Sequence, residues 1–114
     1  MTDVASRTAA DRIRLLNDNF RTTFIGGRIV MTQGVDALPI DTKARLILAV
    51  QSFDKFTEDN DPHREHDFGS FEIEGETYFF KIDYYALDMD SGSEDPADPE
   101  KTTRVLTIMR ADEY

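Results

Sequence analysis

The chain has 114 residues, a formal net charge of −10, 39% hydrophobic residues, 8 phenylalanines, 4 tyrosines and no cysteine. This length and apolar content predict a single domain, 1–114, with a real hydrophobic core, and they exclude wholesale disorder. The lack of cysteine excludes disulfides, thiol nucleophiles and cysteine-based zinc or iron–sulfur sites. No segment approaches the roughly 18 apolar residues of a membrane helix, and the first residues lack the apolar core of a signal peptide, so we expect a cytoplasmic protein.

The negative charge is concentrated in the second half of the chain. Residues 1–56 hold 6 acidic and 8 basic residues, a balance of +2, whereas residues 57–114 hold 17 and 5, a balance of −12. A surface that follows nucleic-acid phosphates needs clustered lysine and arginine, so nucleic-acid binding is not expected on the acidic half. Four arginines of the first predicted helix indicate either a solvated face or a phosphate-binding one: Arg7, Arg12, Arg14 and Arg21.

The N-terminal part predicts a leader, a helix and a strand. Residues 1–7 are expected to be disordered, and Thr8 with Asp11 then resembles a capping box. Apolar residues at helical spacing form one stripe from which the arginines point away: Ile13, Leu16, Phe20 and Phe24. Gly26-Gly27 is expected to end this helix, and the β-branched residues of 28–33 predict a strand between glycines.

A second helix is predicted over 41–56, with Asp41 or Asp36 as its cap. Its core-facing stripe consists of apolar residues at helical spacing: Leu46, Ala49, Val50, Phe53 and Phe56. Further apolar residues widen this surface, which predicts a helix covered on more than one side: Leu38, Ile40, Ile47 and Leu48.

The strongest β pattern is a hairpin over 71–85 that turns near Gly75. Its first arm is polar on one face, as at a sheet edge, and its second arm is apolar enough to be central. An acidic loop over 88–103 and a final strand over 104–110 follow. The resulting order, α-β-α-β-β-β, predicts an α+β domain in which two helices pack on a mainly antiparallel four-stranded sheet.

The loop 57–67 holds the residues with metal-binding chemistry. His63 and His66, beside Asp61, Glu65 and Asp67, are imidazole and carboxylate ligands of the kind that zinc, manganese or nickel uses. The two histidines share one side only if the loop takes a helical turn, which Pro62 and Gly69 do not favour. We therefore expect no metal and no cofactor, and keep the histidines as weak candidates. Alternatively, His66 and Asp67 hydrogen-bond the loop to the hairpin while His63 is exposed.

A catalytic interpretation makes His66 an acid or base. Asp67 or Asp83 would orient it, and a further group would polarise the substrate: Lys81, Tyr84 or Tyr85. No nucleophile motif or phosphate-binding glycine loop accompanies these residues, so the balance favours a protein that is not an enzyme.

Several blocks of the chain resemble a bacterial family of unknown function, the 3768 family: DNDPHREHDFGSFE, FFKIDYYALD, GSEDPADPEKTTRVLTIMRADEY and, near the N-terminus, LNDNFRTTFIGGRIVMTQGV. The resemblance extends from about Asp11 to Tyr114. It implies no assigned activity and no catalytic residue. It does imply a bacterial setting, often on plasmids and other mobile elements.

Two functions follow as hypotheses. The first is a non-enzymatic interaction module whose acidic loops, 57–67 and 88–100, dock a basic protein partner, with Tyr78, Tyr84 and Tyr85 nearby. That partner would be a nucleic-acid-binding or host defence protein, and the acidic face would partly imitate phosphate. The second is a small enzyme or metal-dependent protein centred on the loop 61–67. The candidate binding residues are Asp61, His63, Glu65, His66, Asp67, Tyr84 and Tyr85.

Overall fold

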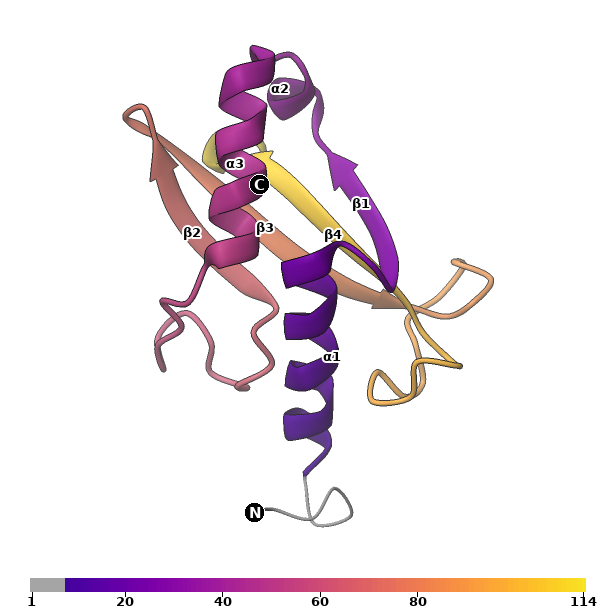
Figure 1. Cartoon of the computed structure of the whole chain (residues 1–114). Helices are drawn as coiled ribbons and strands as arrows, with labels where there is room; N and C mark the ends of the chain where they lie inside the picture. Colours follow the sequence, from indigo (N-terminus) through magenta and orange to yellow (C-terminus); the bar gives the residue numbers. More distant parts are fainter. Residues whose placement is uncertain (1–7) are drawn as a thin grey trace.

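The computed structural model describes residues 8–114, so the predicted leader at 1–7 lies outside the described residues. The elements follow in the order α1 (Ala9–Thr23), β1 (Gly27–Met31), α2 (Gln33–Asp36), α3 (Ile40–Ser52), β2 (Phe68–Ile73), β3 (Glu76–Tyr85), β4 (Thr103–Arg110) and a 3₁₀ turn, η2 (Ala111–Glu113). The strands form one sheet in the order β1-β4-β3-β2, and α1 and α3 cover one face of it (Figure 1). The predicted α+β class is confirmed, with the short helix α2 as an addition.

The sheet is mixed, which corrects the expected antiparallel pairing at β1. This strand pairs with β4 in parallel, from Gly27 opposite Arg104 to Met31 opposite Ile108. The direction of each element explains the pairing. β1 runs toward one end of the sheet, α3 returns along its face, and β2, β3 and β4 then alternate in direction (Figure 1). β1 and β4 therefore point the same way, and β4 has one parallel and one antiparallel neighbour.

Helix α1 begins as predicted and ends slightly earlier. The Thr8 and Asp11 side chains form the reciprocal capping box. The helix ends at Phe24, whose φ of 62° is left-handed and whose N–H donates to the Phe20 carbonyl. The prediction that the arginines point away from the core is wrong for Arg21, whose exposed fraction is only 4%.

Helix α3 is shorter at its C-terminus than predicted. It begins after Pro39 without a side-chain cap, and the chain leaves it at Phe53 with an extended backbone. Arg21 of α1 explains this end, because its Nη1 donates to the carbonyls of Val50 and Phe53 at 3.1 and 2.9 Å. Phe56 consequently lies in the loop beyond the helix, not on its stripe.

Only one side of α3 reaches the sheet. Leu46 and Val50 are completely buried, whereas Ile40 and Leu48 on the outer side are 80% and 66% exposed. The predicted coverage on more than one side is therefore wrong for these outer residues.

The predicted hairpin is confirmed, with β2 at the sheet edge and β3 inside. Glu74 and Gly75 form its turn with φ of 56° and 83°, the positive values that match the twist of paired strands. Gly69 of β2 serves a different purpose, since a Cβ there would lie 2.2 Å from Phe80 and 3.0 Å from Phe53. The ring of Phe53 reaches Phe80 across this glycine, with centroids 5.3 Å apart.

The core lies between the helices and one face of the sheet. Its buried residues come from every layer of the domain: Phe20, Val35, Leu46, Val50, Tyr78, Phe80, Ile82, Leu106 and Ile108. On the other face, Phe68 and Phe79 contact the C-terminal Tyr114, with ring centroids 6.2 and 5.7 Å apart. None of the helices in the described part of the chain combines the length and the apolar content needed to cross a bilayer.

Candidate functional site

The loop 57–67 is folded around the carboxylate of Asp61. This residue is 5% exposed, and its Oδ1 accepts the N–H groups of Glu65 and His66, both at 3.1 Å. Arg64 and His66 take left-handed backbone conformations, with φ of 59° and 55°. The Asp61 side chain thus replaces main-chain hydrogen-bond partners and curls the loop so that the His66 ring faces α1.

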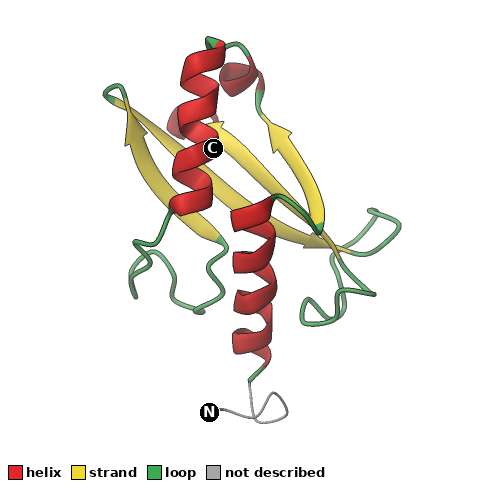
Figure 2. Cartoon of the chain, viewed as in Figure 1, coloured by secondary structure: helices red, strands yellow, loops and turns green. Residues whose placement is uncertain are grey.

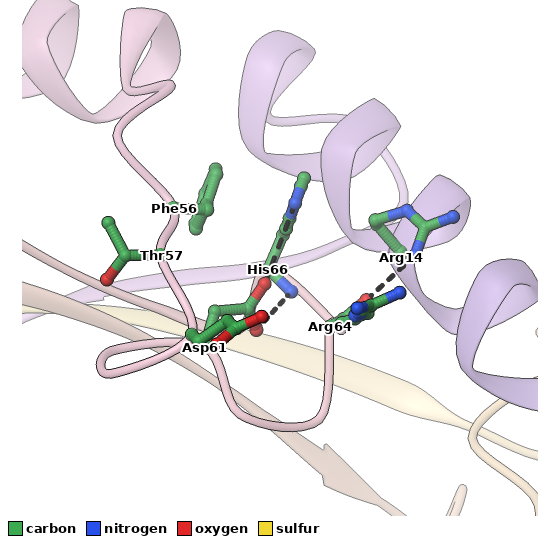
Figure 3. Close-up of a pocket in the computed structure, with 7 residues that line it drawn as sticks. Arg14, Phe56, Thr57, Asp61, Arg64 and His66 are labelled. Atoms are coloured by element: carbon green, nitrogen blue, oxygen red, sulfur yellow. Dashed lines mark hydrogen bonds and ion pairs between the residues drawn. The ribbon is translucent and has the colours of Figure 1, made fainter.

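The imidazole of His66 lies between two carboxylates and an aromatic ring. Its Nδ1 donates to Asp18 Oδ1 at 2.8 Å, and its Nε2 lies 3.6 Å from Asp61 Oδ2. The ring stacks on Phe56 with centroids 3.7 Å apart and planes 4° apart, and the two side chains lie side by side in Figure 3. Asp18 also accepts from Arg21 Nη2 at 3.0 Å. One carboxylate therefore links His66 to the arginine that binds carbonyls at the C-terminal end of α3.

A second polar cluster centres on Asn17, which is completely buried. Its Nδ2 donates to the Glu65 carbonyl at 2.9 Å and to the Tyr84 hydroxyl at 2.8 Å. Its Oδ1 accepts from Arg104 Nε at 2.8 Å, and Arg104 Nη2 donates in turn to the Pro96 carbonyl. One asparagine of α1 therefore connects the loop 57–67 to the acidic loop 86–102. Figure 2 shows these two loops at the same end of the sheet, on either side of α1.

Burial shifts the pKa of three groups in this region, and it lowers that of the Arg104 guanidinium. It raises the pKa of the Tyr84 phenol, as does the hydrogen bond that Tyr84 donates to Glu65 at 2.7 Å. Tyr84 therefore remains a protonated donor. Burial also raises the pKa of Asp67, with a smaller contribution from the Glu65 carboxylate.

The structure does not gather the predicted catalytic residues into one site. The carboxylates at the His66 ring are those of Asp18 and Asp61, not those of Asp67 or Asp83. Lys81 and Asp83 form an ion pair of 3.0 Å. They alternate along β3 with the buried Phe80 and Ile82, so they lie on the sheet face opposite the helices.

The other predicted residues are dispersed. His63 is exposed, Tyr78 belongs to the core and Tyr85 lies on the helix-free face beside the acidic loop. Between residues 8 and 114 no group of three or more His, Asp or Glu side chains is arranged to hold a metal ion.

Sequence reasoning missed the partners that α1 and β4 supply: Asn17, Asp18, Arg21 and Arg104. For Asn17, the sequence did contain a feature that indicates a buried position. Asn17 follows Ile13 by four residues and precedes Phe20 by three, so it lies on the apolar stripe of the helix. A polar residue at such a position has to find buried partners.

A cavity of about 270 Å³ opens beside His66 (Figure 3). Positive and negative groups share its lining: Arg14, Phe56, Thr57, Glu58, Asp61, Arg64 and His66. The Arg14 guanidinium donates to the Arg64 carbonyl at 3.1 Å and to Asp11 Oδ1 at 2.8 Å. Because opposite charges balance there, the cavity favours neither anions nor cations by charge alone.

A larger cavity, of about 430 Å³, lies in the acidic loop. Leu87 on its wall is 63% exposed. The only cation in the lining is Lys101, whose Nζ is 3.6 Å from Glu94. The loop is held by its own hydrogen bonds, including one of 2.7 Å between the Ser93 and Thr102 hydroxyls. The full lining is Ala86, Leu87, Asp88, Ser91, Gly92, Glu94, Glu100 and Lys101.

Comparison with known proteins gives one match. No curated protein and no solved structure matches the chain. The model of the family described as protein of unknown function (DUF3768) matches residues 31–113, which include both acidic loops and exclude α1 with Asn17 and Asp18. Because the matched segment is most of the chain, this protein belongs to the DUF3768 family.

Proposed function

We propose that this protein is a non-enzymatic interaction module that docks a basic partner protein through the loop 86–102. One observation carries the proposal: an exposed leucine lies in a cavity whose lining holds three acids and one lysine. Arginine and lysine combine an apolar stem with a cationic head. Such a side chain would lay its stem on Leu87 and place its head among Asp88, Glu94 and Glu100.

The buried polar cluster prepares this surface for binding. Arg104 of β4 donates to the Pro96 carbonyl, and its guanidinium is also held by a hydrogen bond to Asn17 Oδ1. A loop that is already ordered loses less conformational freedom on binding, which favours affinity. The cluster also holds the loop 57–67, whose exposed Glu58 and Asp59 extend the negative surface at the same end of the sheet.

The chemistry of the surface suggests the class of partner. Carboxylates spaced along a fixed loop resemble a row of phosphates, so a protein that itself binds nucleic acid would present a suitable cationic surface. Charge complementarity of this kind mainly accelerates association and weakens as salt rises.

The enzyme hypothesis has less support. Both nitrogens of His66 face carboxylates, so the ring would have to leave Asp18 or Asp61 before it could exchange a proton with a substrate. The contacts of this ring instead hold the loop 57–67 against α1.

Two variants with equal charge change test the proposal. The first neutralises the loop: Asp88→Asn, Asp90→Asn, Glu94→Gln and Glu100→Gln. The control neutralises four exposed acids at the opposite end of the sheet: Asp36→Asn, Asp41→Asn, Glu76→Gln and Asp112→Asn. The probe is a blocked twelve-residue peptide with four arginines, whose affinity is measured by calorimetry over a series of salt concentrations.

We expect the loop variant to bind the peptide at least about tenfold more weakly and the control to change less than about threefold, because nearby charges dominate at physiological salt. Affinity of the unmodified protein should fall steadily as salt increases. Equal losses in both variants, or an affinity that does not change with salt, would refute docking at the loop.

A further inference from the structure

The outer edge of β2 carries unpaired main-chain groups. β2 is the last strand of the sheet order, with β3 as its neighbour there. The Ile82 N–H donates to the Asp67 carbonyl at 2.8 Å, and main-chain groups in antiparallel strands alternate between the two edges. The groups of Gly69, Phe71 and Ile73 therefore point to β3, and those of Phe68, Ser70 and Glu72 point away from the sheet.

A groove follows this edge. It has a volume of about 630 Å³ and lies between the C-terminal part of α3 and β2. Phe53 and Phe71 supply aromatic surface, and Ser70 and Glu72, two of the residues with outward main-chain groups, also line it. The full lining is Ala49, Ser52, Phe53, Asp54, Lys55, Ser70, Phe71, Glu72 and Thr77.

The edge lacks three of the common devices that block pairing, and its one charged residue is Glu72. Natural edge strands are commonly blocked by proline, by lysine or by a bulge. The sequence of β2, FGSFEI, contains neither proline nor lysine. Its register with β3 runs without interruption from Phe68 opposite Lys81 to Ile73 opposite Glu76.

We propose that an extended segment of a basic partner protein adds to β2 as a fifth strand. Outward N–H and C=O groups require a strand as their partner, and a groove beside a helix accepts every second side chain of that strand. β2 has six residues, so a bound segment of five or six residues would match its length at about 3.3 Å per residue. Apolar side chains of the segment would lie over Phe53 and Phe71.

Charge selects the occupant. Asp54 and Glu72 in the groove outnumber Lys55, which favours basic residues at the positions between the apolar ones. A second copy of this chain would bring another net charge of −10 to the same edge, which opposes self-pairing. The inference extends the proposed interaction function with a second contact that can be tested separately.

The test uses a blocked six-residue peptide in which valine alternates with arginine, and two N-methylated forms of it that are isomers of each other. One isomer is N-methylated at every valine and the other at every arginine. In an added strand only one of these two sets of amides faces β2. We expect one isomer to bind like the parent peptide and the other at least about tenfold more weakly. Equal affinities of the isomers would refute strand addition.

Variants of Ser70 test the protein side. Ser70→Pro removes an outward N–H, which an edge strand tolerates, whereas Ser70→Ala retains it. We expect the proline variant alone to lose peptide affinity, by about tenfold. Hydrogen exchange on the unmodified protein checks this independently of the variant's folding, because the peptide should protect the amides of Phe68, Ser70 and Glu72. Unprotected amides would refute the proposal.

Two outcomes separate strand addition at β2 from binding at the loop 86–102 and from pairing with a second copy of the chain. The loop variant and its matched control should bind the alternating peptide equally well, and a loss in the loop variant alone would place the peptide on the loop 86–102. Sedimentation gives the other comparison. A dimer that Ser70→Pro converts to monomer would show that a second copy occupies the edge, and it would overturn the assignment to a basic partner.

Discussion

The imidazole of His66 lies parallel to the ring of Phe56, with the two centroids 3.7 Å apart. Phe56 follows α3, and His66 lies at the end of the loop 57–67, so the stack joins the two ends of this loop. Asp18 then ties the same imidazole to α1 through a hydrogen bond of 2.8 Å. This histidine is consequently an anchor of the tertiary structure.

Replacing this anchor should destabilise the protein. His66→Ala removes the stack and the bond to Asp18, and we expect the free energy of unfolding to fall by about 1–2 kcal/mol. The measurement is urea denaturation followed by circular dichroism. His63→Ala, at an exposed position of the same loop, is the control and should change stability by less than about 0.5 kcal/mol. Equal effects of the two substitutions would contradict the anchoring role.

Arg21 should contribute more, because it is buried and satisfies two carbonyls of α3. Arg21→Met keeps much of the volume but leaves these carbonyls without their donor and leaves Asp18 with only the bond from His66. We expect the free energy of unfolding to fall by about 3 kcal/mol, because two carbonyls lose a buried, charged hydrogen-bond donor. Replacing an exposed arginine of β1, Arg28→Met, should be nearly neutral in the same urea denaturation experiment. A neutral Arg21→Met would show that another group satisfies the end of α3.

Two glycine substitutions should differ strongly. At Gly69 an added Cβ would lie 2.2 Å from the Phe80 ring, whereas at Gly92 the nearest atom is 3.8 Å away. Gly69→Ala should therefore cost about 3 kcal/mol or more, because the ring must move within a packed core, and Gly92→Ala should change stability by less than about 0.5 kcal/mol. Comparable melting temperatures for the two variants would be inconsistent with the packing of Phe53 and Phe80 across Gly69.

The pH dependence of stability should reflect Asp67. Burial raises the pKa of Asp67 in the folded protein above its usual value of 3.8. The folded state therefore binds this proton more tightly than the unfolded state, and the contribution of Asp67 to stability falls as pH rises from 3.8 through the folded pKa. At neutral pH the charged, half-buried carboxylate is unfavourable.

Asp67→Asn cannot ionise, so it should be more stable than the unmodified protein at pH 7, and this advantage should shrink as pH falls through the folded pKa of Asp67 toward 3.8. Urea denaturation at pH 7 and pH 3 measures the difference. Asp59→Asn removes one charge from an exposed position of the same loop and is the matched control. An advantage for Asp67→Asn that is the same at both pH values would contradict the raised pKa.

Local pattern predicted much of the fold because each signal depended on neighbouring residues. The Thr8–Asp11 capping box, the Glu74–Gly75 turn and the alternating residues of β3 and β4 all appear as expected. The short helix α2 was missed because its start is fixed from the far end of the chain. Glu113 accepts the Thr32 hydroxyl at 2.6 Å and the Gly34 N–H at 2.9 Å.

The candidate site was predictable only in part. The loop 57–67 and its acids were evident from composition, but the residues that face His66 and Tyr84 lie about 48 and 67 positions away in the chain. Periodicity describes one element at a time and does not show which side chain of α1 meets a loop near β2. For the same reason the arginines of α1 were all predicted to point away from the core, although Arg21 is buried.

By itself the sequence determined the class of the domain, the β2–β3 hairpin and the concentration of acidic residues in the second half, since local propensity and composition govern these properties. Tertiary structure decided that β1 lies parallel to β4, that Asn17 links both acidic loops and that the edge of β2 borders a groove. These relationships join residues far apart in the chain, and they arise from burial and hydrogen-bond satisfaction when the elements pack together.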